Sequence, residues 1–237
     1  MERFPDQFYT ESGGLIHVSP SQASRFAKEV AGDWNPIHDV DSRRFCVPGD
    51  LLFAIVVSRY GLFRRMHFSF RGMVGEDVSL CLPEGSEGRI DITDASGKVY
   101  LQVDRRDESV DEQAVLERFI RCYVAFSGRN FPHFLKPLMA EHGVMFNPQR
   151  PLVVYDSMGF ELETTRIDGM DMALADSSLE VQGRRGEAVL RFRIDVDGEQ
   201  VGSGEKRLII SGLRPYDEKQ LQDFIAEFTR RIEAYSR

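Results

Sequence analysis

The chain has few of the features that crosslink a protein or anchor it in a membrane. Only three cysteines occur, Cys46, Cys81 and Cys122, and they are widely spaced with no CxxC pair. Such cysteines are typical of reduced thiols in the cytoplasm, where disulfides are rare. The longest apolar run, residues 51–57, is far shorter than the roughly 20 residues needed to cross a bilayer. The opening residues MERFPDQFYTE contain no apolar stretch, so no signal peptide is expected and a cytoplasmic location is predicted.

Positive charge is also scarce. The 30 Lys and Arg residues are outnumbered by 38 Asp and Glu residues, which gives a formal net charge of -8. This balance argues against nucleic acid or an anionic membrane as a partner, although a local basic groove could still hold a phosphate-bearing ligand. The five histidines show no metal-ligand spacing, and Gly202-x-Gly204 lacks the strand-to-helix context of a nucleotide loop. No cofactor is therefore expected.

What the chain does contain is a repeated order of elements. In the first half, a helix capped by Ser19 and ending near Gly32 precedes the turn-rich segment DWNPIHDVD, the apolar segment LLFAIVVSRYGLF and several strand-like segments. In the second half, a helix ending near Gly128 precedes SGRNFPH, LKPLMAEHGVMF and further strands, including a hairpin with an Asp197-Gly198 turn. The repetition indicates an internal duplication.

The predicted fold class is α+β. Each half is expected to wrap an antiparallel sheet on a buried helix, near residues 49–63 and 136–146, and the two sheets can join edge to edge. The expected boundaries are 1–108, 109–213 and a C-terminal helix at 214–237. The apolar stripe of that helix is expected to pack on the protein's own body, with a subunit contact in a homodimer as the alternative. The stripe consists of Leu221, Phe224, Ile225, Phe228, Ile232 and Tyr235.

The segment Gly32-Asp33-Trp34-Asn35-Pro36-Ile37-His38 is the most informative in the chain. It resembles the Asp-x-Asn-Pro-x-His motif of MaoC-like dehydratases and R-specific enoyl-CoA hydratases. Val47-Pro48-Gly49-Asp50 is similar to the family's His-Gly-Met turn, with the glycine retained, and FRGMVGEDVSL is similar to a later strand and turn. As a whole the chain also looks like an uncharacterised bacterial family of double hot-dog proteins. The resemblance implies a double hot-dog fold and an acyl-thioester hydratase or dehydratase, a lyase acting on acyl-CoA or on an acyl-carrier-protein thioester.

The resemblance also implies roles for single residues. Asp33 and His38 would be the acid–base pair that delivers water and a proton to an enoyl thioester, since either group can exchange a proton near neutral pH. The backbone N–H of Gly49, at a helix N-terminus, would stabilise the thioester oxygen. Asn35 and Pro36 would fix the turn that aims the pair, and Asn35 would also take part in substrate binding.

Several basic residues are candidates for phosphate contacts. Arg64 and Arg65 are expected at a helix end, where they could contact CoA phosphates or form a solvated face. The segment Gly183-Arg184-Arg185-Gly186 could hold a diphosphate, although it also fits a turn between two strands. Cys46 could be a nucleophile, whereas a buried small apolar residue is the competing interpretation.

The two halves differ at the motif. Arg129 stands where an aspartate would be needed, while Asn130, Pro132 and His133 match loosely, so one competent site is expected, in the first half. Asp50 places a carboxylate beside the expected oxyanion donor, which would oppose an oxyanion. Two alternatives to a hydratase remain at this point. One is a non-catalytic protein that binds acyl-CoA or acyl carrier protein, and the other is a hot-dog thioesterase in which Asp33 activates water against the carbonyl.

Overall fold

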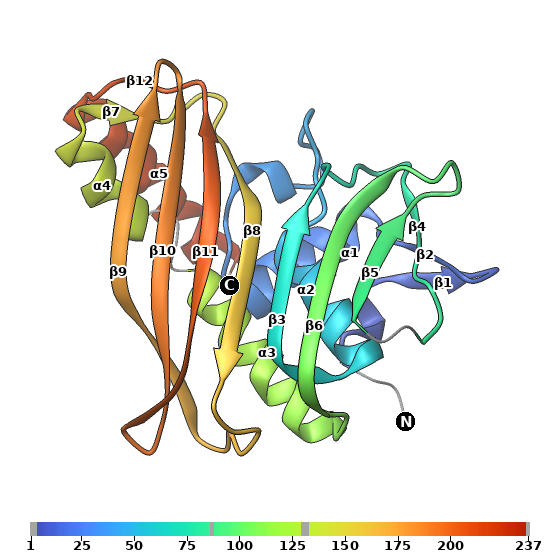
Figure 1. The fold of residues 1–237 in the computed structure, drawn as a ribbon. Coiled ribbons are helices and arrows are strands. Elements are labelled where there is room, and N and C mark those ends of the chain that lie inside the picture. The colour runs from blue at the N-terminus through green and yellow to red at the C-terminus, as the bar shows by residue number, and fades with distance from the viewer. Residues whose placement is uncertain (1–3, 86–87, 129–132, 236–237) are drawn as a thin grey trace.

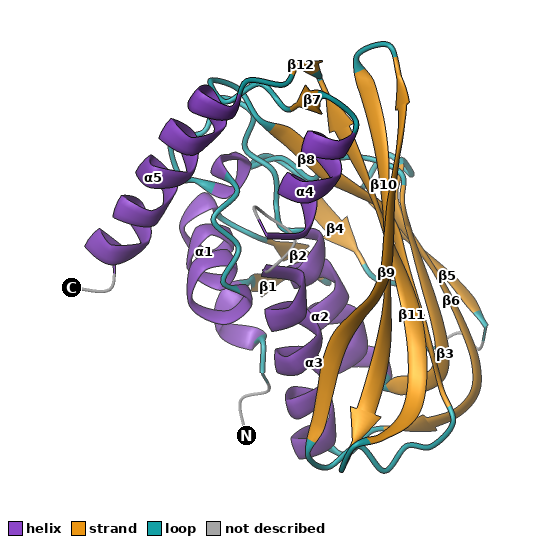
Figure 2. Cartoon of the chain, turned by 90° about the vertical axis from the view of Figure 1, so that its left-hand side faces the viewer, coloured by secondary structure: helices purple, strands orange, loops and turns teal. Residues whose placement is uncertain are grey.

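The structure is a computed structural model that describes residues 4–85, 88–128 and 133–235. Its main element is one antiparallel sheet of ten strands, in the order β1-β2-β4-β5-β6-β3-β8-β11-β10-β9 (Figure 1). The helices lie together on one face of this sheet (Figure 2). The fold is thus the α+β, hot-dog-like arrangement with a long antiparallel sheet that the sequence predicts.

The first half holds two short helices, α1 and α2, together with turns of 3-10 and π-helix and six strands. Their bounds are η1 Asp6–Phe8, β1 Thr10–Ser12, β2 Leu15–His17, α1 Pro20–Arg25, η2 Phe26–Ala31, η3 Pro36–His38, α2 Gly49–Tyr60, β3 Leu62–Phe70, β4 Ser79–Cys81, β5 Arg89–Thr93 and β6 Val99–Val110. The second half holds three helices and six strands. These are α3 Gln113–Gly128, α4 Leu135–Glu141, β7 Val144–Met145, β8 Leu152–Leu162, β9 Met170–Gln182, β10 Arg185–Val196, β11 Glu199–Ser211, β12 Arg214–Pro215 and α5 Glu218–Tyr235.

The two halves of the sheet repeat one topology. The order β3-β6-β5-β4 in the first half matches β8-β11-β10-β9 in the second, strand for strand in chain sequence. The halves join where β3 pairs with β8, with Arg65 opposite Glu161 and Ser69 opposite Ser157. The edges of β3 and β8 that would otherwise be open are thereby paired, as the expected edge-to-edge joining requires. Strand β6 ends at Val110, two residues beyond the expected boundary at 108.

The first helical segment begins and ends as predicted. The side chain of Ser19 accepts a hydrogen bond from the N–H of Gln22, and the Gln22 side chain accepts one from the N–H of Ser19, which completes a capping box. The last six residues, Phe26–Ala31, form a π-helical turn that ends at Gly32, whose φ of 66° is left-handed. This ending delivers Asp33 directly after the helix.

Helix α2 is the buried central helix of the first half. All of its residues from Asp50 to Ser58 are buried, as its nearly continuous apolar sequence predicts. It ends at Tyr60 rather than at residue 63, because Gly61 has a φ of 89° and the chain turns directly into β3.

The corresponding helix of the second half is shorter than expected. Helix α4 spans only Leu135–Glu141 and buries Leu135, Leu138 and Met139. The expectation of a helix to residue 146 is wrong, because Gly143 has a φ of 62° and residues 144–145 form β7, which pairs with β12. Leu221 and Phe228 of α5 share one hydrophobic cluster with α4, whereas Phe119, Tyr123 and Phe126 of α3 belong to the cluster around α2.

The C-terminal helix packs on the protein's own body. Leu221 and Phe228 are buried, and the ring of Tyr235 lies edge-on to Trp34, with 5.2 Å between centroids. Arg231 also forms an ion pair with Asp39. Helix α5 therefore reaches from the second half to the motif loop of the first.

Candidate functional site

The motif loop is held in one conformation by its own side chains. The N–H of Asn35 donates to Asp33 Oδ1 at 2.9 Å, and Asn35 Oδ1 accepts the N–H of Ile37 at 3.4 Å. Asn35 Nδ2 donates to the carbonyl of Val153, on β8, at 3.0 Å. The asparagine thus closes the turn and ties it to the second half, and it also lines the cavity beside Asp33.

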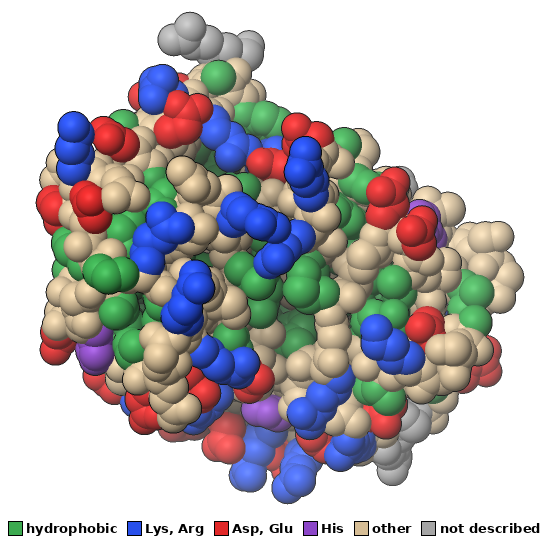
Figure 3. Space-filling view, turned by 90° about the horizontal axis from the view of Figure 1, so that it is seen from above, with side chains coloured by type: hydrophobic (Ala, Val, Ile, Leu, Met, Phe, Trp, Pro, Cys, Tyr) green, Lys and Arg blue, Asp and Glu red, His purple; other side chains and the backbone are tan. Residues whose placement is uncertain are grey.

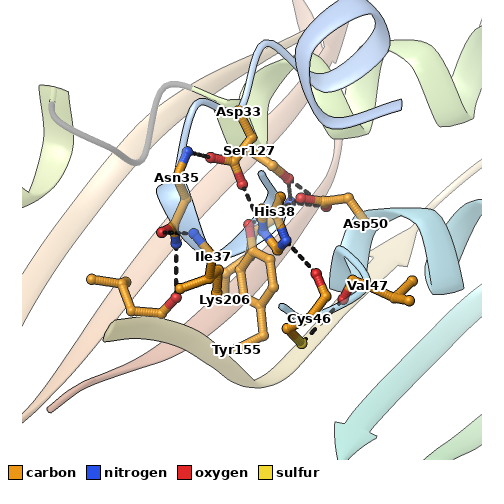
Figure 4. A network of polar contacts seen from close by, with 11 residues as sticks. Asp33, Asn35, Ile37, His38, Cys46, Val47, Asp50, Ser127, Tyr155 and Lys206 are labelled. Atoms are coloured by element: carbon orange, nitrogen blue, oxygen red, sulfur yellow. Dashed lines mark hydrogen bonds and ion pairs between the residues drawn. The ribbon is translucent and has the colours of Figure 1, made fainter. Parts of the chain in front are cut away.

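Asp33 and His38 face one another, as the motif predicts. Asp33 Oδ2 lies 3.5 Å from His38 Nε2, and His38 Nδ1 lies 2.7 Å from the carbonyl oxygen of Cys46 (Figure 4). A carbonyl oxygen can only accept, so Nδ1 carries a proton and Nε2 is turned toward the carboxylate. His38 is 6% exposed and the Asp33 side chain is 18% exposed, so the pair is largely shielded from water.

Opposing effects set the pKa of His38. Burial lowers it, while the hydrogen bond and charge of Asp33, the carbonyl of Cys46 and the charge of Asp50 raise it, and the net result is a raised pKa. The imidazolium form is therefore favoured beside Asp33.

This balance predicts a titration that depends on Asp33. We expect the His38 ring to titrate above its ordinary value of about 6.5 in the wild-type protein. In Asp33→Asn the midpoint should fall, because burial remains while the charge of Asp33 is lost. NMR of the imidazole resonances across pH measures both midpoints. An unchanged midpoint in Asp33→Asn would show that the two groups do not interact.

The stability of the fold should follow the same titration. Because the folded pKa of His38 is raised, its contribution is fully present below the unfolded value of about 6.5. That contribution is lost as the pH rises through the folded pKa.

Asp33 and His38 open onto a cavity of about 320 Å³. Its lining combines residues of the motif loop, the start of α2, the end of β3 and the strands of the second half. They include Asp33, Asn35, His38, Gly49, Phe70, Arg71, Ser127, Tyr155, Asp156 and Arg185. The cavity is thus built from both halves, although the acid–base pair comes from the first.

Gly49 begins α2 at the wall of this cavity. A Cβ at this position would lie 2.9 Å from Tyr155 Cδ2 and 3.0 Å from Phe70 Cζ, so a larger residue would displace both rings. As the first residue of a helix, Gly49 has no carbonyl partner for its N–H within that helix. The N–H is therefore a candidate donor to a ligand oxygen.

A buried polar network lies behind the same wall. The Lys206 ammonium, on β11, donates to Ser127 Oγ and lies 3.7 Å from Asp50 Oδ1. Ser127 Oγ donates to Asp50 Oδ1 at 2.7 Å, and the Tyr155 hydroxyl donates to Asp50 Oδ2 at 3.3 Å. Lys206 is fully buried and Asp50 is 1% exposed, while Ser127 and Tyr155 also line the cavity. Figure 4 shows these four side chains in one network.

The network corrects the expectation for Asp50. Its carboxylate turns toward Lys206, Ser127 and Tyr155, so a nearby cation offsets the charge that was expected to oppose an oxyanion. Burial raises the pKa of Asp50, against the lowering effect of Lys206 and Ser127. Burial lowers the pKa of Lys206 to about 8, against the raising effect of Asp50. Sequence inspection missed Ser127, Tyr155 and Lys206, because they are distant in the chain and no local motif links them.

Other predicted residues lie away from the pair. Arg64 and Arg65 were expected at a helix end, but both lie on β3, because α2 already ends at Tyr60. Arg64 Nε donates to the carbonyl of Leu162 at 2.9 Å. Arg65 pairs with Asp107 at 2.9 Å and lines a second cavity, of about 1050 Å³, apart from Asp33 and His38.

Cys46 fits the interpretation of a buried small residue. Burial raises the pKa of its thiol to about 12, so the thiolate needed for attack is scarce at neutral pH. In the second copy of the motif, His133 is exposed, whereas Arg129, Asn130 and Pro132 lie outside the described residues. Gly183 and Arg184 form the turn between β9 and β10, while Arg185 and Gly186 already belong to β10, and Arg185 lines the cavity of Asp33.

Within residues 4–85, 88–128 and 133–235, no three His, Cys, Asp or Glu side chains gather in a way that could hold a metal ion. Over the same ranges, no helix combines the length and the apolar character needed to span a membrane.

Comparison with known structures finds chains whose backbones superpose in part on this one at low sequence identity. One is a conserved hot-dog-fold protein of unknown function from Alicyclobacillus acidocaldarius, with 8% identity, a TM-score of 0.49 and coverage of 88% of this chain and 96% of that chain. A MaoC-like dehydratase has 9% identity, a TM-score of 0.44 and coverage of 86% and 97%. An acyl-CoA thioesterase II from Mycobacterium marinum has 11% identity, a TM-score of 0.40 and coverage of 89% and 96%.

Comparison with curated proteins gives no match. A family model does match: the one described as "Protein of unknown function (DUF3581)" covers residues 3–219. The chain belongs to that family.

Proposed function

We propose that this DUF3581 member binds an acyl thioester in the cavity beside Asp33 and His38 and adds water to, or removes it from, the acyl group. The observation that carries the proposal is the facing pair, with 3.5 Å between Asp33 Oδ2 and His38 Nε2 at the wall of a cavity. An oxygen atom can lie within hydrogen-bond distance of both groups. A carboxylate and an imidazole on one water are what hydration of a polarised double bond needs.

The proposed reaction places the thioester oxygen at the N–H of Gly49. Asp33 takes a proton from the shared water, and the oxygen of that water bonds to C3 of the enoyl group. The electron pair of the double bond moves onto the thioester oxygen, where the N–H stabilises the negative charge. His38 then donates its Nε2 proton to C2, and Asp33 returns a proton to His38. Dehydration of a 3-hydroxyacyl group is the reverse sequence.

The raised pKa of His38 supports this assignment of roles. With Nδ1 hydrogen-bonded to Cys46, only a doubly protonated ring can donate from Nε2. Asp33 and its neighbours favour that charged form. Asp33, in turn, is the group that can accept the proton of water.

We also propose that the two halves are tandem hot-dog units, at about 1–108 and 109–213, followed by helix α5. The repeated strand order supports the duplication. Asn35 and Gly49, from the first half, act with cavity residues from β8 and β11 of the second. The proposal therefore assigns one competent site to each chain, with the second half supplying its wall.

A panel of enoyl-CoA thioesters of increasing chain length tests the proposal. Loss of the conjugated double bond, followed by its absorbance, would be the expected result with at least one member. If the chain binds these thioesters without converting any of them, the non-catalytic binding protein replaces the hydratase.

Unpaired arginines near the cavity support a phosphate-bearing carrier. Arg43, Arg44 and Arg150 line a neighbouring cavity of about 420 Å³, which shares Ile37 with the main one, and Arg185 lines the main cavity. In the described part of the chain, none of these four arginines forms an ion pair with a carboxylate. Seen from above, Lys and Arg side chains gather around a hollow with a hydrophobic floor (Figure 3). In a protein of net charge -8, this face is suited to an anionic group.

Removing these arginines should weaken binding of the carrier. We expect Arg43→Ser/Arg44→Ser/Arg150→Ser to raise KM for an acyl-CoA about tenfold, because each exposed ion pair contributes roughly up to 1 kcal/mol. KM for the matching N-acetylcysteamine thioester, which has no phosphate, should stay constant. Arg191→Ser is the control, since Arg191 pairs with Asp176 far from the cavity. Equal losses for both substrates would show that the arginines act on the fold rather than on phosphate.

A further inference from the structure

We propose that Ser127 is a nucleophile that accepts acyl groups in the same cavity, with Lys206 as its general base and Asp50 holding Lys206 in place. The cavity would then carry a second activity, cleavage of acyl thioesters through an acyl-serine intermediate. This inference rests on the proposed function only in taking an acyl thioester as the ligand of the cavity.

The three side chains have the connectivity of a nucleophile, a base and an orienting group. Lys206 Nζ is hydrogen-bonded to Ser127 Oγ and lies 3.7 Å from Asp50 Oδ1. Lys206 Nζ also lies 3.5 Å from the carbonyl of Tyr123 and 3.8 Å from the centre of the Tyr123 ring. Ser127 is the member of the three that lines the cavity, so it is the one nearest to an acyl group bound there. While Lys206 is charged, Ser127 Oγ donates to Asp50 Oδ1 at 2.7 Å. Once Lys206 is neutral, its amine can accept the Ser127 proton, which is how hydroxyl nucleophiles are activated.

The burial of the Lys206–Asp50 ion pair is energetically costly and therefore needs an explanation. Removing two charges from water costs several kcal/mol each, and replacing a buried ion pair with apolar residues is often neutral or stabilising. Lys206 is fully buried and Asp50 nearly so, within an otherwise aromatic environment that includes Tyr123 and Phe126. A charged pair kept at such cost beside a cavity is a candidate functional group.

Lys206 can serve as a base near neutral pH. Burial lowers its pKa to about 8, so a substantial fraction is the neutral amine in mildly alkaline solution. The groups that face it are Asp50, Ser127, Tyr123 and Tyr155, and Asp50 is the one that raises its pKa. When Lys206 takes the serine proton, the carboxylate of Asp50 stabilises the resulting ammonium.

The cavity wall that contains Ser127 also contains a candidate hydrogen-bond donor for the oxyanion. Gly49 begins α2 and its N–H has no partner within that helix, while Tyr155 lines the same cavity and its hydroxyl donates to Asp50. The Tyr155 ring lies within van der Waals reach of Gly49, as the 2.9 Å to a Cβ built there shows. The thioester carbonyl at this wall is thus close to both a donor and the Ser127 hydroxyl.

The reaction balances without any other reagent. Neutral Lys206 takes the proton of Ser127, and Oγ bonds to the thioester carbonyl carbon. The carbon–sulfur bond breaks, and the thiolate leaves with the proton of Lys206. Water then attacks the acyl-serine with Lys206 as base, and Ser127 recovers its proton as the free carboxylic acid departs.

A saturated thioester isolates this reaction, because butyryl-CoA has no double bond to hydrate. Wild-type protein is incubated with butyryl-CoA, free thiol is followed with a thiol reagent, and acid-quenched samples are analysed by intact mass and peptide mapping. We expect a butyryl group on Ser127 and thiol release that is at least about 100-fold slower in Ser127→Ala. Ser58→Ala, a buried serine of α2 outside the cavity, should behave like wild type.

The base is tested with two replacements of Lys206. In Lys206→Arg a cation remains to pair with Asp50, but arginine cannot accept the serine proton. We expect no acylation in Lys206→Arg or Lys206→Met, and wild-type acylation that rises with pH as Lys206 becomes neutral. Rescue of acylation by Lys206→Arg would show a structural role and overturn the assignment of the base.

The proposal fails outright in two cases. One is thiol release from butyryl-CoA that is the same in Ser127→Ala, with its fold confirmed by circular dichroism, as in wild type. The other is an acyl group mapped to Cys46 instead of Ser127. Hydration of enoyl-CoA is measured separately, so loss of this inference leaves the Asp33–His38 proposal standing, and the reverse also holds.

Discussion

Asp33→Asn and His38→Ala should each lower the rate of enoyl-CoA hydration by about 10²–10⁴-fold, the usual contribution of an acid–base group. Asparagine keeps the size of Asp33 and can still accept from the N–H of Asn35, but it cannot take a proton from water. Alanine at position 38 removes the donor to C2 and the bond to the Cys46 carbonyl. The measurement is kcat/KM with a short and a longer enoyl-CoA.

His133→Ala is the matched control for His38→Ala. His133 occupies the corresponding place in the second copy of the motif and is exposed, so its removal should leave hydration within about twofold of wild type. Hydration that survives His38→Ala and disappears in His133→Ala would show that the working site lies in the second half of the chain and not in the first.

The second large effect is on stability. Lys206→Met should lower the free energy of unfolding by about 3–5 kcal/mol at pH 7, because it leaves the buried Asp50 carboxylate without its cation. Chemical denaturation measures this loss. The double variant Lys206→Met/Asp50→Leu removes both charges and should recover most of it.

The loss in Lys206→Met should also depend on pH. Burial raises the folded pKa of Asp50, and without Lys206 the opposing effect is gone. A carboxyl with a raised folded pKa has no penalty below its unfolded value of about 3.9, and its penalty grows as the pH rises above that value. Lys206→Met should therefore be closer to wild type at pH 4 than at pH 7. An equal loss at both pH values would indicate a packing defect rather than an unpaired charge.

Local sequence predicted the local structure well, because the interactions involved are local. The capping box of Ser19 and Gln22 and the left-handed Gly32 depend on residues within a few positions of each other. The turn that brings Asp33 to His38 likewise closes through Asn35 and Pro36. The repeated order of elements predicted the matching strand orders of the two halves.

The remaining features of the fold and the site depend on contacts between segments that are distant in the chain. The spacing of residues along the sequence does not encode such contacts. A lysine in the alternating pattern of a strand reads as a surface residue, yet Lys206 is fully buried because Asp50 and Ser127 arrive from two helices. Arg64 and Arg65 looked like a helix end, because Leu62 and Phe63 resume the apolar pattern of α2 directly after Gly61. The glycines that separate these elements, Gly61 and Gly143, were the available signals.

The most direct test of the account is a crystal structure of the protein with an unreactive enoyl-CoA analogue, in which a CH2 group replaces the thioester sulfur. The account predicts the carbonyl oxygen at the N–H of Gly49 and C3 of the enoyl group facing Asp33 and His38. An acyl group bound beside His133, or in the separate cavity lined by Arg65, would contradict it.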